Sequence, residues 1–312
     1  MKTSIKKNEG RTGFTIVELL TVMSIIVILI SLLVPSLNKV KRYAKKVKQK
    51  AQFHSIDVAM ELYATEFDGY PNSDAQDEVP TAYNGALKLA EAMMGQDLLG
   101  FHPDSYFRSD GTTDGTMTAA TDLYPVANTY GIPEYEANLK ARRGPYLQLD
   151  NANAFKLKHL YGVGNTGDLD GERFVLCDVY ARVRVKDDPG DDTDNNIKGK
   201  IGMPILYFKA NLSATKHDYT KITATAPYTT ENIYNVMDNV DVIGLDMPWQ
   251  VGPTHDIEDD PILADWERFY VDTKNDKIST TDMPYNSDSY ILISAGFDGE
   301  YGTSDDVFNF VD

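Results

Sequence analysis

The chain contains very little cysteine, so covalent cross-links cannot hold its fold together. It is 312 residues long and has one cysteine, Cys177, which excludes any disulfide within the chain. Cys177 lies in the apolar, strand-like run 174–180, where the sequence predicts a small buried residue. Packing and hydrogen bonds must therefore fix the loops.

Positive charge is scarce beyond the first 50 residues. The chain holds 30 Lys and Arg against 47 Asp and Glu, a net charge of −17. Residues 1–50 contain 11 basic and 2 acidic residues, so residues 51–312 contain the other 19 and 45, a net of −26. Binding to nucleic acid depends on Lys and Arg contacts with phosphates, so this composition argues against it. Acidic surfaces suit solubility and divalent cations.

Known catalytic motifs are missing or incomplete, and we expect no enzymatic role. No Gly-x-Ser-x-Gly motif is present. Residues 162–167 spell a dinucleotide fingerprint, but turn residues follow and predict no helix to receive a phosphate. Asp259 and Asp260 could serve a glycosidase, yet such pairs arise by chance in so acidic a segment. The histidines show no metal-ligand spacing: His54, His102, His159, His217 and His255.

The N-terminal region contains one long apolar run. Phe14 to Leu37 are 24 residues with a single charge, Glu18, and a membrane-spanning helix needs about 20 apolar residues. The preceding residues 1–13 are basic, as in a leader that stays in the cytoplasm. A secretory signal would be cut after its apolar core, whereas this leader ends before it, at Gly13. Cleavage at Gly13 would therefore keep the membrane anchor.

The segment Gly13-Phe14-Thr15-Ile16-Val17-Glu18 resembles the prepilin N-terminus of type IV pilins and of type II secretion pseudopilins. The resemblance implies cleavage between Gly13 and Phe14 by a prepilin peptidase, and N-methylation of Phe14. It also implies that Glu18 guides assembly by pairing with the Phe14 amine of a neighbouring subunit. A carboxylate inside a bilayer costs at least about 2.5 kcal/mol and needs such a partner. The alternative is a signal anchor with one tolerated acidic residue.

An amphipathic extension, residues 38–64, is predicted to continue the transmembrane helix 14–37. Apolar residues recur there at helical spacing: Val40, Ala44, Val47, Ala51, Ile56, Met60 and Tyr63. A continuous helix would be about 75 Å long, with one half in the bilayer and one half on a soluble domain. Pro35, where the family has a helix-loosening proline, should kink or loosen it.

A basic cluster follows the span and complicates the orientation. Its members are Lys39, Lys41, Arg42, Lys45, Lys46, Lys48 and Lys50. A count of positive charges alone would place this side in the cytoplasm. The resemblance instead requires that the leader 1–13 be cleaved on the cytoplasmic side of the membrane. This implies a single-pass inner-membrane protein with a cytoplasmic N-terminus and a periplasmic or extracytoplasmic ectodomain. The cluster could bind lipid phosphates or acidic neighbours, or form a solvated helix face.

Residues 65–312 are predicted to form an acidic α+β ectodomain with one core. A helix is expected near Tyr83 to Leu99 and a short one over Ile262 to Tyr270. The expected strands are Pro145 to Leu149, Arg173 to Val185, Pro204 to Lys209 and Ser289 to Ala295. With the resemblance, this predicts a pilin-like fold, a long N-terminal helix packed on an enlarged antiparallel sheet.

The C-terminal segment 294–307 is rich in glycine and aspartate. Asp298, Asp305 and Asp306 offer three carboxylates on a backbone that can turn freely, a setting that suits Ca²⁺ with its 6 to 8 oxygen ligands. The segment resembles the calcium loop of the major, G-type pseudopilin, which implies that these three residues bind Ca²⁺ together with backbone carbonyls. The alternative is an acidic turn without an ion. A second cation site is less favoured than a solvated hairpin tip at Asp187, Asp188, Asp191, Asp192 and Asp194.

These features predict a structural pseudopilin. It would assemble with its own copies, other pseudopilins and inner-membrane secretion components into a helical periplasmic pseudopilus for type II secretion. The alternatives are a type IV pilin or adhesin of a surface fibre, and an enzyme tethered by a pilin-like anchor. The resemblance covers the two ends only, because about 220 residues lie between Ala64 and Tyr290, far more than in a typical member.

Overall fold

The structure is a computed structural model that describes most of the chain. The described residues are 14–75, 81–126, 129–186, 197–222, 231–245, 255–257 and 266–310. The predicted leader 1–13 with Gly13, the aspartates of 187–194, and the pair Asp259 and Asp260 lie outside these ranges. The chain divides into two compact units, Met1–Lys45 and Lys46–Asp312.

Helix α1, Ile16–Phe67, confirms the predicted long N-terminal helix. It has 52 residues, ends three residues beyond the predicted Ala64, and is assigned as helix without a break at Pro35. Its first part is exposed and apolar, and among the described residues α1 is the helix long and apolar enough to cross a membrane. The chain is thus compatible with a single-pass membrane protein.

The buried face of α1 differs in part from the predicted stripe. The buried residues are Gln49, Gln52, Phe53, Ile56, Ala59, Met60 and Tyr63, whereas the predicted Val40, Ala44, Val47 and Ala51 are exposed. The two sets lie on different sides of a helix with 3.6 residues per turn, so the prediction merged two faces. The Tyr63 ring packs 5.3 Å from that of Phe101, and Tyr290 donates a hydrogen bond of 2.7 Å to Asp57.

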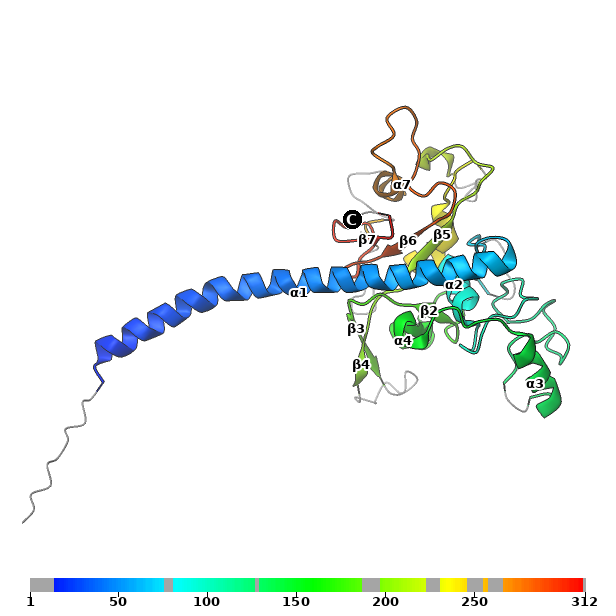
Figure 1. The fold of residues 1–312 in the computed structure, drawn as a ribbon, viewed down its shortest axis with the longest axis horizontal. Helices are drawn as coiled ribbons and strands as arrows, with labels where there is room; N and C mark the ends of the chain where they lie inside the picture. The colour runs from blue at the N-terminus through cyan, green and yellow to red at the C-terminus, as the bar shows by residue number, and fades with distance from the viewer. Residues whose placement is uncertain are drawn as a thin grey trace, which may run out of the picture. The chain divides into compact units, whose positions relative to one another are not determined.

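In the described residues, three small antiparallel sheets confirm the α+β class, but they stand in place of the single enlarged sheet that was predicted. The central sheet has the order β5-β6-β7 (Figure 1), formed by Leu206–Lys209, Tyr290–Ser294 and Val307–Phe308. Leu206 lies opposite Ile293 in its register. All residues of β6 are buried, so this strand lies at the centre of the core. The other two sheets are two-stranded: β1 Ala154–Lys156 with β2 Phe174–Leu176, and β3 Val183–Lys186 with β4 Ile197–Ile201.

The predicted helix near Tyr83 to Leu99 is present as α2, Gly85–Met94. It is shorter than predicted because Asn84 caps its start by accepting from the Leu87 N–H, and Gly95 ends it with φ of 78°. All of its residues are buried, including Lys88 and Glu91. The other helices within the described ranges are α3 Ile132–Ala141, α4 Leu149–Ala152, α5 Leu157–Tyr161, η1 Tyr219–Lys221, η2 Val236–Asn239, α6 Val240–Ile243 and α7 Glu267–Thr273.

Two strand predictions are corrected, one by hydrogen bonds to a distant helix end and one by a local turn. Pro145 to Leu149 is not a strand, because the backbone N–H groups of Tyr146 and Leu147 bond the Met93 carbonyl at the end of α2. The run Arg173 to Val185 splits into β2 and β3, because Asp178 accepts from the Tyr180 N–H and forms a turn between them. Cys177 is fully buried, as predicted.

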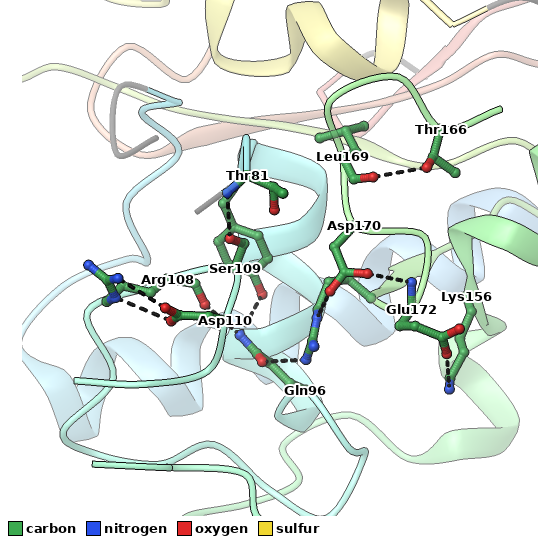
Figure 2. A network of polar contacts seen from close by, with 12 residues as sticks. Thr81, Gln96, Arg108, Ser109, Asp110, Lys156, Thr166, Leu169, Asp170 and Glu172 are labelled. Atoms are coloured by element: carbon green, nitrogen blue, oxygen red, sulfur yellow. Dashed lines mark hydrogen bonds and ion pairs between the residues drawn. The ribbon is translucent and has the colours of Figure 1, made fainter. Parts of the chain in front are cut away.

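A polar network connects loops that a disulfide would otherwise have to hold (Figure 2). The Gln96 amide, just after α2, donates to the Arg108 carbonyl at 2.8 Å and accepts from Arg173 at 2.6 Å. Arg173 also bonds Asp170 at 2.7 Å, and Arg108 pairs with Asp110 at 3.0 Å. The network therefore ties the 96–110 region to the β2 hairpin.

Stability is expected to depend on one buried carboxyl, Asp238 of η2, whose exposed fraction is 6%. Burial raises its pKa to about 7, so the folded state holds this proton more tightly than the unfolded chain, and stability falls as pH rises from about 4 to 7. Asp238→Asn should therefore raise the free energy of unfolding at pH 8, by up to about 4 kcal/mol, and leave it little changed at pH 4. Denaturant unfolding at both pH values tests this, with the exposed Asp276→Asn as control. An equal change at both pH values would contradict it.

Candidate functional site

Glu18 caps the start of α1. The Thr15 backbone N–H and hydroxyl donate to the Glu18 carboxylate at 2.9 and 2.7 Å, and the Glu18 N–H donates to the Thr15 hydroxyl at 3.2 Å. This is a capping box, in which a Thr and a Glu three residues later satisfy the free N–H groups of the first turn. The spacing is visible in the sequence, but we did not predict the cap. Glu18 thus has a local role in capping α1, and any test of its role in assembly must distinguish the two roles.

An apolar stripe on the C-terminal half of α1 faces away from the core. Within the unit that begins at Lys46, Val47, Val58 and Leu62 are 51, 50 and 53% exposed, and Ala51 is exposed between them. These positions are spaced 4, 7 and 4 residues apart, which places them on one side of a helix. In the preceding unit, Val40 and Tyr43 are also exposed. We call Val47, Ala51, Val58 and Leu62 the outer stripe.

The basic cluster is mostly exposed. Lys39, Lys41, Arg42, Lys46 and Lys48 are exposed, and Lys45 and Lys50 are partly buried. Exposed lysine ammonium groups such as those of Lys39 and Lys41 could contact lipid phosphates or an acidic surface of another copy, and they are equally well solvated by water.

The loop between β6 and β7 is organised by its own aspartates. The Asp305 carboxylate accepts from the N–H groups of Phe297 and Asp298 at 2.6 and 3.1 Å. The Asp306 carboxylate accepts from the Gly302 N–H at 2.8 Å. The predicted calcium loop 294–307 is therefore a closed turn between two paired strands.

The carboxylates of Asp298 and Asp305 both contact the hydroxyl of Thr303. The Thr303 oxygen lies 3.0 Å from an oxygen of Asp298 and 2.8 Å from one of Asp305. A hydroxyl has one proton, so it can donate to only one carboxylate at a time. Burial, and next the neighbouring Asp305, raise the pKa of Asp298 to about 6. A shared proton or a cation would relieve this crowding of negative charge.

Asp306 leaves one buried carboxylate oxygen without a partner. No hydrogen bond reaches its Oδ1 from the described residues, and burial raises the pKa of Asp306. Asp306 borders a cavity of about 300 Å³ that is also lined by Arg268, Asp272 and Thr303. An unpartnered buried carboxylate oxygen is costly, so a cation or a proton is expected there.

The predicted ligands are brought together in part. Asp298 and Asp305 adjoin, whereas Asp306 makes its own contacts, and no three His, Cys, Asp or Glu side chains in the described ranges stand grouped around a metal position. The donors are all oxygens, which suits Ca²⁺. Glu300, which we did not predict, belongs to the same acidic loop: burial, followed by Asp256, raises its pKa to about 6. The sequence Asp298-Gly299-Glu300, in which Glu300 follows a predicted ligand by two residues, is the signal that could have identified it.

Gly296 is expected to be essential to the loop. Its φ is 65°, and a Cβ there would lie 2.2 Å from the Asp305 carbonyl oxygen. Gly164 also has a positive φ, 82°, but nothing lies within 4 Å of its Cβ position. Gly164→Ala should therefore lower the free energy of unfolding by only about 1 kcal/mol, the cost of a left-handed backbone conformation for alanine. Gly296→Ala should cost about 1 to 3 kcal/mol more, because the Asp305 backbone must move. Equal losses in denaturant unfolding would show that the loop tolerates the movement.

Comparisons with protein-family profiles, with curated proteins and with solved structures found no match to this chain.

Proposed function

We propose that this chain is a structural pseudopilin subunit, cleaved between Gly13 and Phe14 by a prepilin peptidase and assembled into a periplasmic filament for type II secretion. The subunit is held in the inner membrane by the apolar part of α1 until assembly. On cleavage, the N-terminal amine of Phe14 becomes a free cation, which is methylated in the resembling families. The function is mechanical: growth of the filament would push exported proteins outward.

The outer stripe carries this proposal. A helix that covers a single soluble domain needs only one apolar face, yet α1 buries Phe53, Ile56 and Met60 and still exposes Val47, Val58 and Leu62. Apolar side chains aligned along a helix are favourable only when another surface covers them. Side-by-side packing of α1 helices from several copies would supply that surface.

Glu18 would set the register between copies. Its carboxylate lies near the start of a segment exposed along its length and long enough to cross a membrane. In a filament core of packed apolar helices, the Phe14 amine of a neighbour is the cation that would pair with it. We propose this pair as the assembly contact, additional to the capping box.

Calcium would lock the C-terminal loop. Asp298 and Asp305 would supply side-chain oxygens, Asp306 a further carboxylate, and backbone carbonyls the rest. The crowding at Thr303 and the unpartnered oxygen of Asp306 support a cation. Bound calcium would tie β6 to β7 and so stiffen the central sheet.

The alternative is a type IV pilin or adhesin of a surface fibre, favoured by the large insertion between α1 and β6. The two differ in outcome. A secretion pseudopilin gives an export defect on deletion and no long extracellular fibres, whereas a surface pilin gives fibres and normal export. Partners in the first case are other pseudopilins and inner-membrane secretion components.

The proposal is tested by cross-linking within the outer stripe. Cys177 is buried, so an introduced cysteine would be the accessible thiol of the described residues. Val58→Cys, expressed with a prepilin peptidase and oxidised in membranes, should give disulfide-linked dimers. Asp276→Cys, in an exposed turn, is the matched control and should stay monomeric. Mass spectrometry of the same sample should show loss of residues 1–13.

Two results would overturn the proposal. One is an intact N-terminus when an active peptidase cleaves a known substrate beside it. The other is equal dimer yield from Val58→Cys and Asp276→Cys, which would reflect random collision and not helix packing.

A further inference from the structure

A polar cavity of about 370 Å³ lies in the unit Lys46–Asp312 and shares no residue with the C-terminal loop. Three segments line it: the stretch after α1, the end of β5, and the residues leading into η2. Its polar lining residues are Asn72, Ser73, Asp74, Lys209, Asn211, Asn232, Asn235 and Asp238, of which Asp74 and Asn211 have interactions of their own. The volume is within the range of small-molecule sites, roughly 300 to 1,000 Å³.

Lys209, the last residue of β5, brings a partly buried ammonium to this cavity. Within the described part of the chain, its side chain forms no hydrogen bond and no ion pair, and burial lowers its pKa. Burying an unpaired charge is costly, so the site gains from a ligand that carries an anionic group.

Asp238 brings a buried carboxyl to the same cavity. One oxygen accepts from the Ser73 hydroxyl, and no hydrogen bond from a described residue reaches the other. Burial raises the pKa of Asp238 to about 7; Asp74 acts in the same direction and Lys88 of α2 opposes it. Asp238 and Lys209 form no ion pair with each other, so each can take a separate partner.

Amide groups supply further donors around the wall. The Asn72 side-chain oxygen accepts from the Asp74 N–H, and the Asn235 oxygen accepts from the Met237 N–H. Both oxygens are thereby occupied, whereas the NH₂ groups of Asn72 and Asn235 bond no described residue. The wall therefore suits a ligand with polar acceptor groups beyond its charges.

We propose that this cavity binds a small polar α-amino acid, with its ammonium at Asp238 and its carboxylate at Lys209. This function is additional to filament assembly and does not rest on it. A neutral sugar would leave both protein charges unmatched. A simple anion would satisfy Lys209 only, and a simple cation would satisfy Asp238 only. A zwitterion satisfies both and allows the two protein groups to be charged at neutral pH.

The test is calorimetric titration of the full-length chain in detergent micelles with L-asparagine. Two analogues remove one charge each: succinamic acid lacks the ammonium and 3-aminopropanamide lacks the carboxylate. Hydrogen bonds to charged groups contribute about 1.5 to 3 kcal/mol, so each analogue should bind at least about tenfold more weakly. Lys209→Met and Asp238→Asn should weaken asparagine binding by a similar factor. The exposed Lys277→Met is the control and should bind as the wild type does.

Proton release gives an independent readout. Because Asp238 must ionise to receive an ammonium, the binding enthalpy at pH 7 should depend on the ionisation enthalpy of the buffer, and Asp238→Asn should remove this dependence. No binding of asparagine up to about 10 mM would overturn the proposal. So would equal binding of succinamic acid by the wild type, a comparison that needs no variant to fold. Binding that survives in both folded variants would also overturn it.

Discussion

Glu18→Gln is expected to abolish assembly while leaving α1 capped. A glutamine can take the place of glutamate in a capping box, so its side-chain oxygen still accepts from Thr15. It cannot, however, neutralise the Phe14 amine of a neighbouring copy. Removing one partner of a buried ion pair costs about 3 to 5 kcal/mol, which corresponds to a loss of more than about 100-fold in the contact.

The measurement is the fraction of cleaved subunit recovered in cross-linked oligomers, with cleavage followed separately by mass spectrometry. Thr15→Val is the matched control, because it removes the hydroxyl from the cap and keeps the charge of Glu18. Assembly should survive in Thr15→Val and fail in Glu18→Gln. The opposite pattern would assign Glu18 to helix capping and remove its role between subunits.

Calcium is expected to stabilise the full-length chain in detergent, and substitution of Asp305 to remove that gain. An ion that binds only the folded state adds about 2.7 kcal/mol at 100 times its dissociation constant. For a domain of this size, such a gain raises the thermal midpoint by about 5 to 10 °C. Asp305→Ala and Asp305→Asn should both lose the increment, because both remove the charge.

The two Asp305 variants distinguish a role in binding calcium from a role in holding the loop through hydrogen bonds. Asp305→Asn keeps an oxygen for the N–H groups of Phe297 and Asp298, so it should match the wild type in chelator, whereas Asp305→Ala should be less stable there. An unchanged calcium increment in both variants would exclude Asp305 as a ligand. No increment in the wild type would leave the segment as an acidic turn.

The calcium increment should also depend on pH. Ligand carboxylates must be ionised, and the pKa of Asp298 is about 6 because of burial and the adjacent Asp305. The increment should therefore shrink as pH falls below about 6. The difference with and without calcium is the quantity to follow, because buried His217 and His255, whose pKa values burial lowers to about 4, change stability in the same range.

The sequence predicted that α1 and α2 exist, because both carry strong local signals, but it placed the end of α2 and part of the buried face of α1 wrongly. The apolar run from Phe14 and the helical spacing of Ile56, Met60 and Tyr63 are visible in the sequence. Asn84 and Gly95, which end α2 inside the predicted range, are local signals that the prediction did not use. The strands β5 and β6 were predicted for the same reason, as continuous apolar runs. Cleavage at Gly13 and calcium binding at Asp298, Asp305 and Asp306 stay predictions.

The tertiary structure decided which surfaces and charges meet. The sequence by itself determined the membrane-length apolar helix, the segregation of charge and the absence of disulfides, because composition and periodicity fix these. Contacts between distant segments decided that Val47 and Val58 lie outside the core and that Lys209 and Asp238 line one cavity. Burial and pairing depend on partners far along the chain, so no local pattern could show them.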